Sequence, residues 1–198
     1  LKDRAIQQLS LIGYSWGSAI CGRYAGEFES KVSRLVLSGA LWVEKGATPR
    51  TISADIGAYR TVDAGSMAKR WATGLSGDEI DAIVPPARVS RWCSDTVLVD
   101  PIGDKSGLLR APTGVLKDFM NYSHTGEPWY KPREILAPTQ VVVGELDKET
   151  TPEQARKVFE QLGNAHEKRL TIIGGGTHSL LLEDRRDALH NVVSGFLA

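Results

Sequence analysis

A single pentapeptide, Gly13-Tyr14-Ser15-Trp16-Gly17, carries the side chain in this sequence that is best placed for covalent chemistry. It matches the pattern G-x-S-x-G, follows an apolar stretch at 9–12 and precedes a stretch with small side chains at 18–24. Strand, sharp turn and helix in that order predict a strained turn that exposes the Ser15 hydroxyl above a sheet. We expect both glycines to be required, because strand and helix meet there too closely for side chains. A tight turn without chemistry is the alternative.

A serine hydroxyl needs a base to become a nucleophile at neutral pH, and the base needs an acid to orient it. The predicted base is His178, which follows a strand expected at 169–173 and three glycines that let the loop fold back towards Ser15. A capping or loop histidine is the alternative. The remaining histidines fit the role less well, because they lie in an insertion, between a helix and a strand, or within the last helix: His124, His166 and His190.

The predicted acid is Asp147, in the loop after a strand expected at 139–143. An aspartate there could accept a hydrogen bond from the second ring nitrogen of His178 and stabilise the imidazolium. Glu145 is the reserve candidate and Glu44 a weaker one, and a solvated loop carboxylate is the alternative for Asp147. The order serine, acid, histidine is the one in which such a triad follows a G-x-S-x-G turn.

Two further parts of a hydrolytic site are predicted less completely. The backbone N–H of Trp16 is the expected first donor to a tetrahedral oxyanion. The second donor normally comes from a loop earlier in the chain, which this sequence does not contain, and losing one donor costs about 10²–10³ in rate. Tyr14, Trp42 and Trp129 are candidate pocket residues. Alternatively, such aromatic side chains form only the core of their segment.

The elements that must position these groups alternate between strand and helix at both ends of the chain. This alternation predicts an α/β fold with a mostly parallel sheet and helices on both faces. A strand is expected at 32–37. A helix is expected to begin with Thr151 as its N-cap, Pro152 at its first position and Gln154 completing a capping box.

The middle of the chain has a different character. Short amphipathic pieces occur at 52–59, 66–75 and 116–122, and no run of buried strands is evident. We therefore expect three regions, with a helical insertion between two parts of one core. The insertion would act as a cap that closes over Ser15 and sets specificity. The regions are 1–44 (core, with the serine turn), 45–133 (cap) and 134–198 (core, with the acid and the histidine).

Composition limits the class of protein. The 198 residues are 41% hydrophobic and 24% charged, with a net charge of zero and no basic runs, which gives no indication of nucleic-acid binding. No apolar stretch approaches the ~18 residues that span a bilayer. Cys21 and Cys93 have no metal-ligand spacing; a buried Cys21 with an unrelated Cys93 is expected, and a single disulfide is the alternative. The low cysteine content favours a reducing, cytoplasmic location.

Together these motifs resemble the α/β-hydrolase fold superfamily, in particular its cap-bearing serine hydrolases and esterases. The resemblance rests on 13–18, on 138–147 with the following Thr151-Pro152, and on 176–179. It covers the C-terminal two-thirds of that fold. No glycine-rich phosphate loop, dinucleotide fingerprint or metal cluster accompanies the motifs, so no cofactor is expected.

The resemblance implies that Ser15 is the nucleophile, His178 the base and Asp147 its partner. The implied activity is cleavage of a small or medium carboxylic ester through an acyl-enzyme. An acyltransferase or aminopeptidase with the same triad, and a non-catalytic binding subunit with this fold, are the alternatives. The sequence Ser15-Trp16-Gly17-Ser18 also resembles proline iminopeptidases, whose acidic cluster for the amino terminus has no clear counterpart here.

The sequence departs from the family by lacking the first strands and the oxyanion loop. Without them, the strand before Ser15 would form an exposed hydrophobic edge, which favours aggregation. We therefore expect a separate N-terminal chain that completes the sheet and the oxyanion hole, produced by cleavage of a precursor or by a split gene. A homo-oligomer that covers the edge is the alternative.

Overall fold

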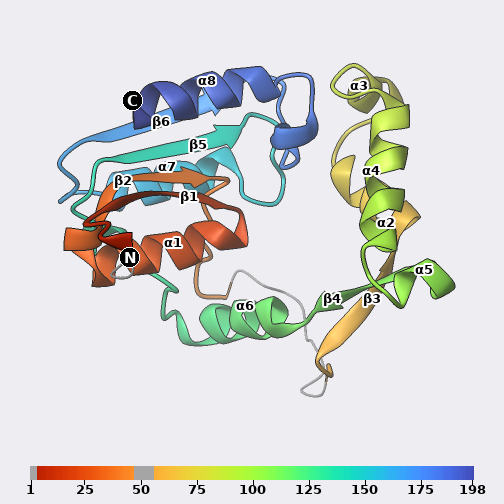
Figure 1. Ribbon diagram of the computed structural model, residues 1–198, viewed down its shortest axis with the longest axis horizontal. Helices are drawn as coiled ribbons and strands as arrows, with labels where there is room; N and C mark the ends of the chain where they lie inside the picture. Colours follow the sequence, from red (N-terminus) through yellow and green to blue (C-terminus); the bar gives the residue numbers. More distant parts are fainter. Residues whose placement is uncertain (1–3, 47–55) are drawn as a thin grey trace. The chain divides into compact units, whose positions relative to one another are not determined.

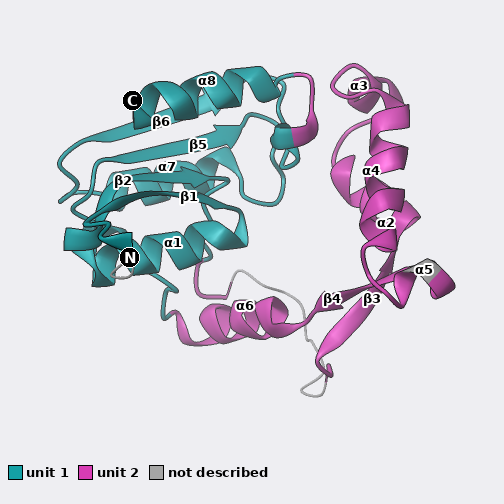
Figure 2. Cartoon of the chain, in the orientation of Figure 1, with its two compact units in different colours: residues 1–43, 127–181, 185–198 teal, residues 44–126, 182–184 magenta. Residues whose placement is uncertain are grey.

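The described part of the chain, residues 4–46 and 56–198 of a computed structural model, divides into two compact units (Figures 1 and 2). Unit 1 comprises residues 1–43, 127–181 and 185–198. Unit 2 comprises residues 44–126 and 182–184. Unit 2 therefore shares residues 45–126 with the predicted insertion, whereas 127–133 belong to unit 1.

Unit 1 is built on a four-stranded parallel sheet in the order β1-β2-β5-β6. The strands are β1 (Leu9–Tyr14), β2 (Val32–Ser38), β5 (Thr139–Gly144) and β6 (Lys168–Ile173). The helices are α1 (Trp16–Glu27), α7 (Pro152–Gln161) and α8 (Arg186–Leu197), with short 3₁₀ helices η2 (Glu29–Lys31), η3 (Pro132–Glu134) and η4 (Leu180–Leu182). The predicted α/β class with a mostly parallel sheet is confirmed.

Alternating side chains of the two central strands fill two cores, one on each face of the sheet. On one face, Leu35 and Leu37 of β2 pack in a cluster with buried residues of α1, β5 and α7. On the other face, Val36 and Val142 pack with Leu189 of α8 and its neighbours. Both central strands are buried on both faces, as is usual for parallel strands between helices. Truncating a fully buried leucine such as Leu35 to alanine would cost about 2–5 kcal/mol.

β1 lies at one edge of this sheet and, among the described residues, pairs with β2 alone. The side chains of Ser10, Ile12 and Tyr14 on one of its faces are exposed, and Ile12 is 55% exposed. This strand is thus an apolar edge within the described part of the chain. Its coverage by a separate N-terminal chain or by a second copy stays a prediction.

The start of α7 departs from its predicted capping. Thr151 is the N-cap, its hydroxyl accepts the N–H of Gln154 at 3.4 Å, and Pro152 opens the helix. The side chain of Gln154 does not complete a capping box. Its Oε1 accepts instead from the N–H of Trp42 at 3.5 Å, a bond that joins α7 to the chain after β2. A long-range partner has replaced the local one, which sequence spacing cannot reveal.

Unit 2 is mostly helical but also contains a two-stranded antiparallel sheet. Its strands are β3 (Tyr59–Asp63) and β4 (Leu108–Pro112), and its helices are α2 (Ala64–Trp71), α3 (Gly77–Asp81), α4 (Pro86–Leu98), α5 (Gly103–Ser106) and α6 (Gly114–Thr125). These strands were not expected, because neither is a buried apolar run. Of the predicted piece at 52–59, residues 52–55 lie outside the described residues, and Tyr59 begins β3.

The segment 182–184 is held in unit 2 by polar contacts. The carboxylate of Glu183 is fully buried and accepts the indole N–H of Trp71 at 2.9 Å. Asp184 pairs with Arg88 at 2.7 Å, and its N–H donates to the carbonyl of Ile83. These bonds explain why the segment 182–184, which begins with the last residue of η4, groups with the helices of unit 2.

Both cysteines are free thiols, which excludes the alternative of a disulfide between them. Cys21 is half-buried on α1 and Cys93 is buried on α4, and burial raises the pKa of each thiol. Over the described ranges, no helix combines the length and the apolar character needed to cross a bilayer.

Candidate active site

Ser15 occupies the sharp turn between β1 and α1. Its backbone angles are φ 52° and ψ −122°, a conformation that residues other than glycine rarely adopt and that costs about 1–3 kcal/mol. The N–H of Ser15 donates to the carbonyl of Ser38 at the end of β2, at 2.9 Å. The turn is therefore strained as the G-x-S-x-G pattern predicts, and the neighbouring strand anchors it.

The two glycines of the pattern differ in what they do. A Cβ on Gly13 would lie 2.5 Å from the carbonyl oxygen of Gly17 and 2.8 Å from the Cα of Ser18, so strand and helix meet there as predicted. A Cβ on Gly17 would meet no described atom within 4 Å. The expectation that both glycines are required by close approach is correct for Gly13 and wrong for Gly17.

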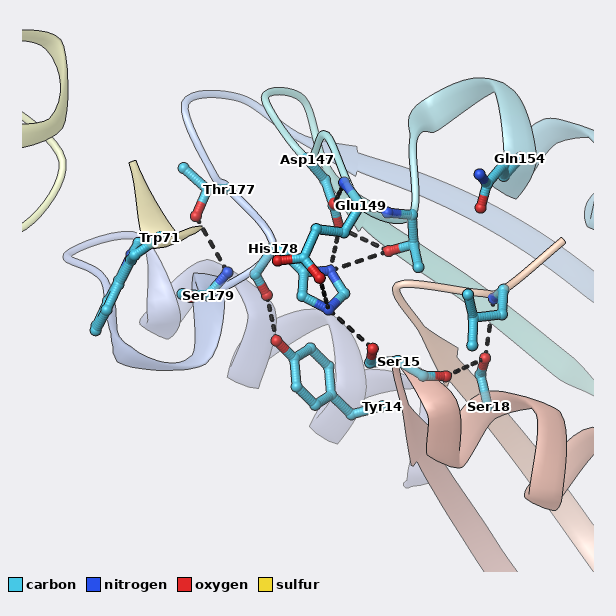
Figure 3. A network of polar contacts seen from close by, with 12 residues as sticks. Tyr14, Ser15, Ser18, Trp71, Asp147, Glu149, Gln154, Thr177, His178 and Ser179 are labelled. Carbon is cyan, nitrogen blue, oxygen red and sulfur yellow. Dashed lines mark hydrogen bonds and ion pairs between the residues drawn. The ribbon is translucent and has the colours of Figure 1, made fainter. Parts of the chain in front are cut away.

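The structure brings together the three residues that the sequence singled out for chemistry (Figure 3). The Nε2 atom of His178 lies 2.8 Å from the Oγ of Ser15. Its Nδ1 lies 2.9 Å from the Oδ2 of Asp147. The side chain of His178 is 11% exposed and that of Asp147 is 2% exposed. In this arrangement one ring nitrogen can take the hydroxyl proton while the other donates to a buried carboxylate.

The carboxylate of Asp147 is held by its own loop. The backbone N–H groups of Glu149 and Thr150 both donate to Oδ1 at 2.8 Å. The hydroxyl of Thr150 donates to Oδ2 at 2.7 Å and lies 3.1 Å from Nδ1 of His178. Burial by itself raises the pKa of Asp147, but the hydrogen bonds from His178 and Thr150 and the attraction of His178 outweigh it and lower the pKa. Asp147 is thus an ionised acceptor at neutral pH.

Close approach of backbone brings the acid loop and the histidine loop together. A Cβ on Gly144 would overlap the carbonyl group of Gly176, and the N–H of Leu146 donates to that carbonyl at 2.8 Å. Gly175 has a φ of 69°, and a Cβ on Gly176 would lie 2.6 Å from Leu180. The three glycines before His178 are expected to let the loop fold back towards Ser15, and two of them, Gly175 and Gly176, do so through a positive φ and a close approach to Leu180.

Tyr14 contacts the histidine directly. Its ring stacks on that of His178, with centroids 5.2 Å apart and planes inclined by 29°. Its hydroxyl donates a hydrogen bond to the carbonyl of His178 (Figure 3). The predicted role of Tyr14 as a pocket residue stays a prediction. In the structure, Tyr14 supports the histidine loop.

The other aromatic candidates divide between the turn and the core. Trp16 is the first residue of α1, so its N–H belongs to the positive end of that helix. Its ring packs edge-on against that of Trp129, with centroids 4.8 Å apart. Trp42 packs edge-on against Tyr130 at 6.3 Å and lies against the hydrophobic core of unit 1. These contacts place Trp129 beside the residue that follows Ser15.

Neither of the two reserve candidates for the acid contacts Nδ1 of His178 through a hydrogen bond given for the described residues. Glu145 is exposed and accepts the N–H of Gly175 at 3.0 Å, where it braces the histidine loop. Glu44 lies in unit 2, where its charge contributes, after burial, to the raised pKa of Tyr122. Asp147 is accordingly the carboxylate that meets Nδ1 of His178.

Sequence reasoning missed three residues around the site. Thr150 holds Asp147, and Glu149 has its Oε2 3.8 Å from Nε2 of His178. Ser18 is fully buried; its hydroxyl donates to the carbonyl of Ser15 at 2.6 Å and accepts the N–H of Leu41 at 3.0 Å. Two features of the sequence could have indicated them. Ser18 lies three positions after Ser15, and Glu149 and Thr150 are polar residues between Asp147 and the start of α7.

The described residues were compared with the side-chain groupings that hold metal ions in proteins. Within them, no three or more histidine, cysteine, aspartate or glutamate side chains are arranged to hold a metal ion.

Comparison with known proteins places the chain in a family. Among curated proteins no sequence matches it. A serine hydrolase involved in carbazole degradation is 18% identical, with a TM-score of 0.61, 96% of this chain covered and 64% of that chain. A monoacylglycerol lipase from Paleococcus ferrophilus is 20% identical, with a TM-score of 0.63 and coverages of 98% and 70%. An esterase from Exiguobacterium antarcticum is 19% identical, with a TM-score of 0.60 and coverages of 100% and 69%.

This chain thus spans about two-thirds of the length of these structures, and at such identities the likeness concerns the fold. The sequence profile described as "alpha/beta hydrolase fold" matches residues 5–184, far more than half of the chain. Because this match covers most of the chain, and the strained serine turn and parallel sheet agree with it, the chain belongs to the α/β-hydrolase fold family.

Proposed function

We propose that this protein is a serine hydrolase that cleaves small or medium carboxylic esters through an acyl-enzyme. The observation that carries the proposal is the pair of hydrogen bonds at His178. In the proposed ground state the hydroxyl of Ser15 donates to Nε2 across 2.8 Å, and Nδ1–H donates to the Oδ2 of Asp147 across 2.9 Å. Both bonds already have the lengths that a general base and its orienting acid require.

In the first half-reaction the Oγ of Ser15 attacks the ester carbonyl while its proton passes to Nε2 of His178. Asp147, ionised and hydrogen-bonded to Nδ1, stabilises the imidazolium that forms. The tetrahedral intermediate then loses the alcohol: the carbon–oxygen bond breaks, its electrons go to the leaving oxygen, and Nε2–H supplies the proton. The acyl group remains on Ser15.

In the second half-reaction water attacks the acyl carbon and gives its proton to Nε2. Collapse of this second intermediate returns the proton to the Oγ of Ser15 and releases the carboxylic acid. The negative oxygen of both intermediates is stabilised by the N–H of Trp16 at the positive end of α1. The strained conformation of Ser15 supports this assignment, because such strain persists where the surrounding structure holds a residue for function.

The similar structures support an ester substrate without showing it. They include an esterase and a monoacylglycerol lipase, whose names describe ester cleavage by those proteins. The substrate of this chain is thus proposed as a small or medium carboxylic ester.

The test is intact mass spectrometry before and after treatment with an uncharged fluorophosphonate, which reacts with activated serines. We expect one adduct per chain in the wild type and none in Ser15→Ala. The matched control is Ser10→Ala, which removes an exposed serine of β1 and should label like the wild type. Hydrolysis of 4-nitrophenyl acetate by the same three proteins should follow the same pattern.

Absence of a Ser15-dependent adduct would contradict the proposal and favour a binding protein with this fold. An adduct together with rapid acyl transfer to an added alcohol, and slow hydrolysis, would favour an acyltransferase instead. Mass spectrometry of the purified material would also reveal any second chain that co-purifies.

A further inference from the structure

A buried serine on α1 holds the peptide that follows the proposed nucleophile. The hydroxyl of Ser18 donates to the carbonyl of Ser15 at 2.6 Å (Figure 3). The backbone N–H of Ser18 donates to the same oxygen at 2.8 Å. The hydroxyl also accepts the N–H of Leu41 at 3.0 Å. A hydroxyl has one proton to donate, so with the N–H of Leu41 on its acceptor side that proton is directed to the carbonyl of Ser15.

The burial of Ser18 makes this hydroxyl hard to replace. Ser18 has no exposed surface, and a Cβ on Gly13 would lie 2.8 Å from its Cα, so β1 and α1 are in close contact at this point. Water therefore does not reach the hydroxyl in the folded protein. Removing it would leave the N–H of Leu41 without this acceptor and the carbonyl of Ser15 with one donor fewer.

The planarity of the peptide bond links this carbonyl to the proposed oxyanion donor. The carbonyl of Ser15 and the N–H of Trp16 belong to one rigid trans peptide, in which they point in opposite directions. Fixing the direction of the carbonyl therefore also fixes the direction of the N–H. Ser15 has φ 52° and ψ −122°, so rotation of this peptide towards an ordinary conformation would relieve strain unless hydrogen bonds oppose it.

We propose that Ser18 is a positioning residue for the oxyanion hole: its hydroxyl fixes the peptide between Ser15 and Trp16, so that the N–H of Trp16 points to the place where the oxyanion forms. This inference rests on the proposed function and adds a residue to it. The bond from Ser18 also polarises the peptide, which strengthens its N–H as a donor. Loss of a whole oxyanion donor costs about 10²–10³ in rate, so a donor that is present but less well aligned is expected to cost about tenfold.

The test compares the wild type with Ser18→Ala and with Val32→Ala. Val32 is buried in the hydrophobic core of unit 1, at the opposite end of β2 from Ser38, so its truncation loosens packing away from the serine turn. Complete fluorophosphonate labelling counts the competent sites by mass spectrometry, and kcat and KM for 4-nitrophenyl acetate are expressed per labelled site. The inhibition constant of phenylboronic acid is measured as well, because its boron adds the Ser15 oxygen and becomes a tetrahedral anion that resembles the intermediate.

Acylation and deacylation both pass through an oxyanion, so Ser18→Ala should slow both steps. We expect kcat to fall about tenfold with little change in KM, and the inhibition constant of phenylboronic acid to rise by a similar factor. Val32→Ala should keep both values per labelled site, although it unfolds at a lower denaturant concentration. A role of Ser18 in packing alone would instead affect the two variants alike.

A wild-type kcat per labelled site in Ser18→Ala would overturn the inference, and equal falls in both variants would do the same. In either case Ser15-dependent turnover leaves the proposed function standing. Where Ser18→Ala yields no folded protein, Ser18→Cys replaces it, because a thiol fills the space and donates only weakly. We expect a reduced kcat in that variant, and a wild-type kcat there contradicts the inference. Absence of a Ser15-dependent adduct in the wild type would contradict the proposed function as well, so the two failures are distinguishable.

Discussion

At the scale of single residues, the site is held by groups that lie one contact away from the proposed reacting atoms. Thr150 donates through its N–H and its hydroxyl to the two oxygens of Asp147. Tyr14 supports His178 through a stacked ring and a bond to its carbonyl. The imidazole is therefore positioned from both sides, and the strength of these supports can be measured.

The hydroxyl of Thr150 is expected to matter for rate more than for substrate binding. In Thr150→Val a buried carboxylate loses one donor, and a hydrogen bond to a charged group contributes about 1.5–3 kcal/mol. We expect kcat for ester hydrolysis to fall about tenfold or more with little change in KM, and Thr150→Ser to restore most of the loss. Steady-state kinetics of the three proteins checks this, and equal kinetics for the Val and Ser variants would contradict it.

The lowered pKa of Asp147 also predicts how stability depends on pH. A carboxyl whose pKa is lower in the folded state stabilises the fold above its ordinary pKa of about 3.9, and this contribution disappears as pH falls through the folded value. Asp147→Asn should thus be less stable than the wild type at pH 7, by a margin that shrinks below pH 4. Urea unfolding of both proteins at pH 7 and pH 3 measures the margin.

A margin between wild type and Asp147→Asn that is the same at both pH values would show that ionisation of this carboxyl is not linked to folding. The same substitution should reduce kcat by about 10⁴, because an amide cannot hold the imidazole in the required tautomer.

At the scale of elements, the site depends on places where backbones approach closely. β1 and α1 meet at Gly13, and the loops after β5 and β6 meet where Gly144 faces Gly176. These contacts bring together the C-terminal ends of β1, β5 and β6, which are separated by long stretches of sequence. Open α/β sheets bind ligands at this carboxyl end of their parallel strands.

The two glycines of the serine turn offer a matched pair for this idea. Gly13→Ala places a Cβ 2.5 Å from the backbone oxygen of Gly17. We therefore expect the free energy of unfolding to fall by about 1–3 kcal/mol and the activity to fall with it. Gly17→Ala meets no described atom within 4 Å and lies inside α1, so it should stabilise the protein by about 0.4–1 kcal/mol. Chemical denaturation of both variants provides the measurement, and similar losses in both would contradict the contrast.

At the scale of the whole molecule, β1 is an edge strand within the described part of the chain, with Ile12 exposed on one face. Apolar edge strands associate with other strands unless they are covered or carry a charge. The predicted cover of this edge is a separate N-terminal chain or a second copy of this chain. The association state of the purified chain therefore tests whether the β1 edge needs a cover.

We expect this chain by itself to self-associate through the β1 edge and Ile12→Lys to reduce that association. The control is Ile20→Lys, since Ile20 is 59% exposed on α1 and lies on no sheet edge. Size-exclusion chromatography with light scattering compares the three proteins. A well-folded, soluble monomer of the unmodified chain would contradict the need for a cover, and equal effects of both lysines would mean that surface charge alone is responsible.

The sequence by itself determined the parts of this protein that depend on local pattern. The strands of unit 1, the serine turn and the helix start at Thr151 follow from apolar runs, glycines and a capping residue within a few positions of each other. Their places directly after predicted strands marked Ser15, Asp147 and His178 as candidates among many polar residues, because the family motifs relate these positions to strand ends.

Only the tertiary structure decided the contacts between segments distant in sequence. Gln154 bonds to Trp42 instead of closing its own helix, β3 pairs with β4 although neither is a buried run, and the carboxylate of Glu149 lies beside His178. The physical reason is common to all three. Local propensity limits which backbone conformations a segment adopts, whereas the partner of a polar group or an exposed strand depends on which distant segment packing brings within reach.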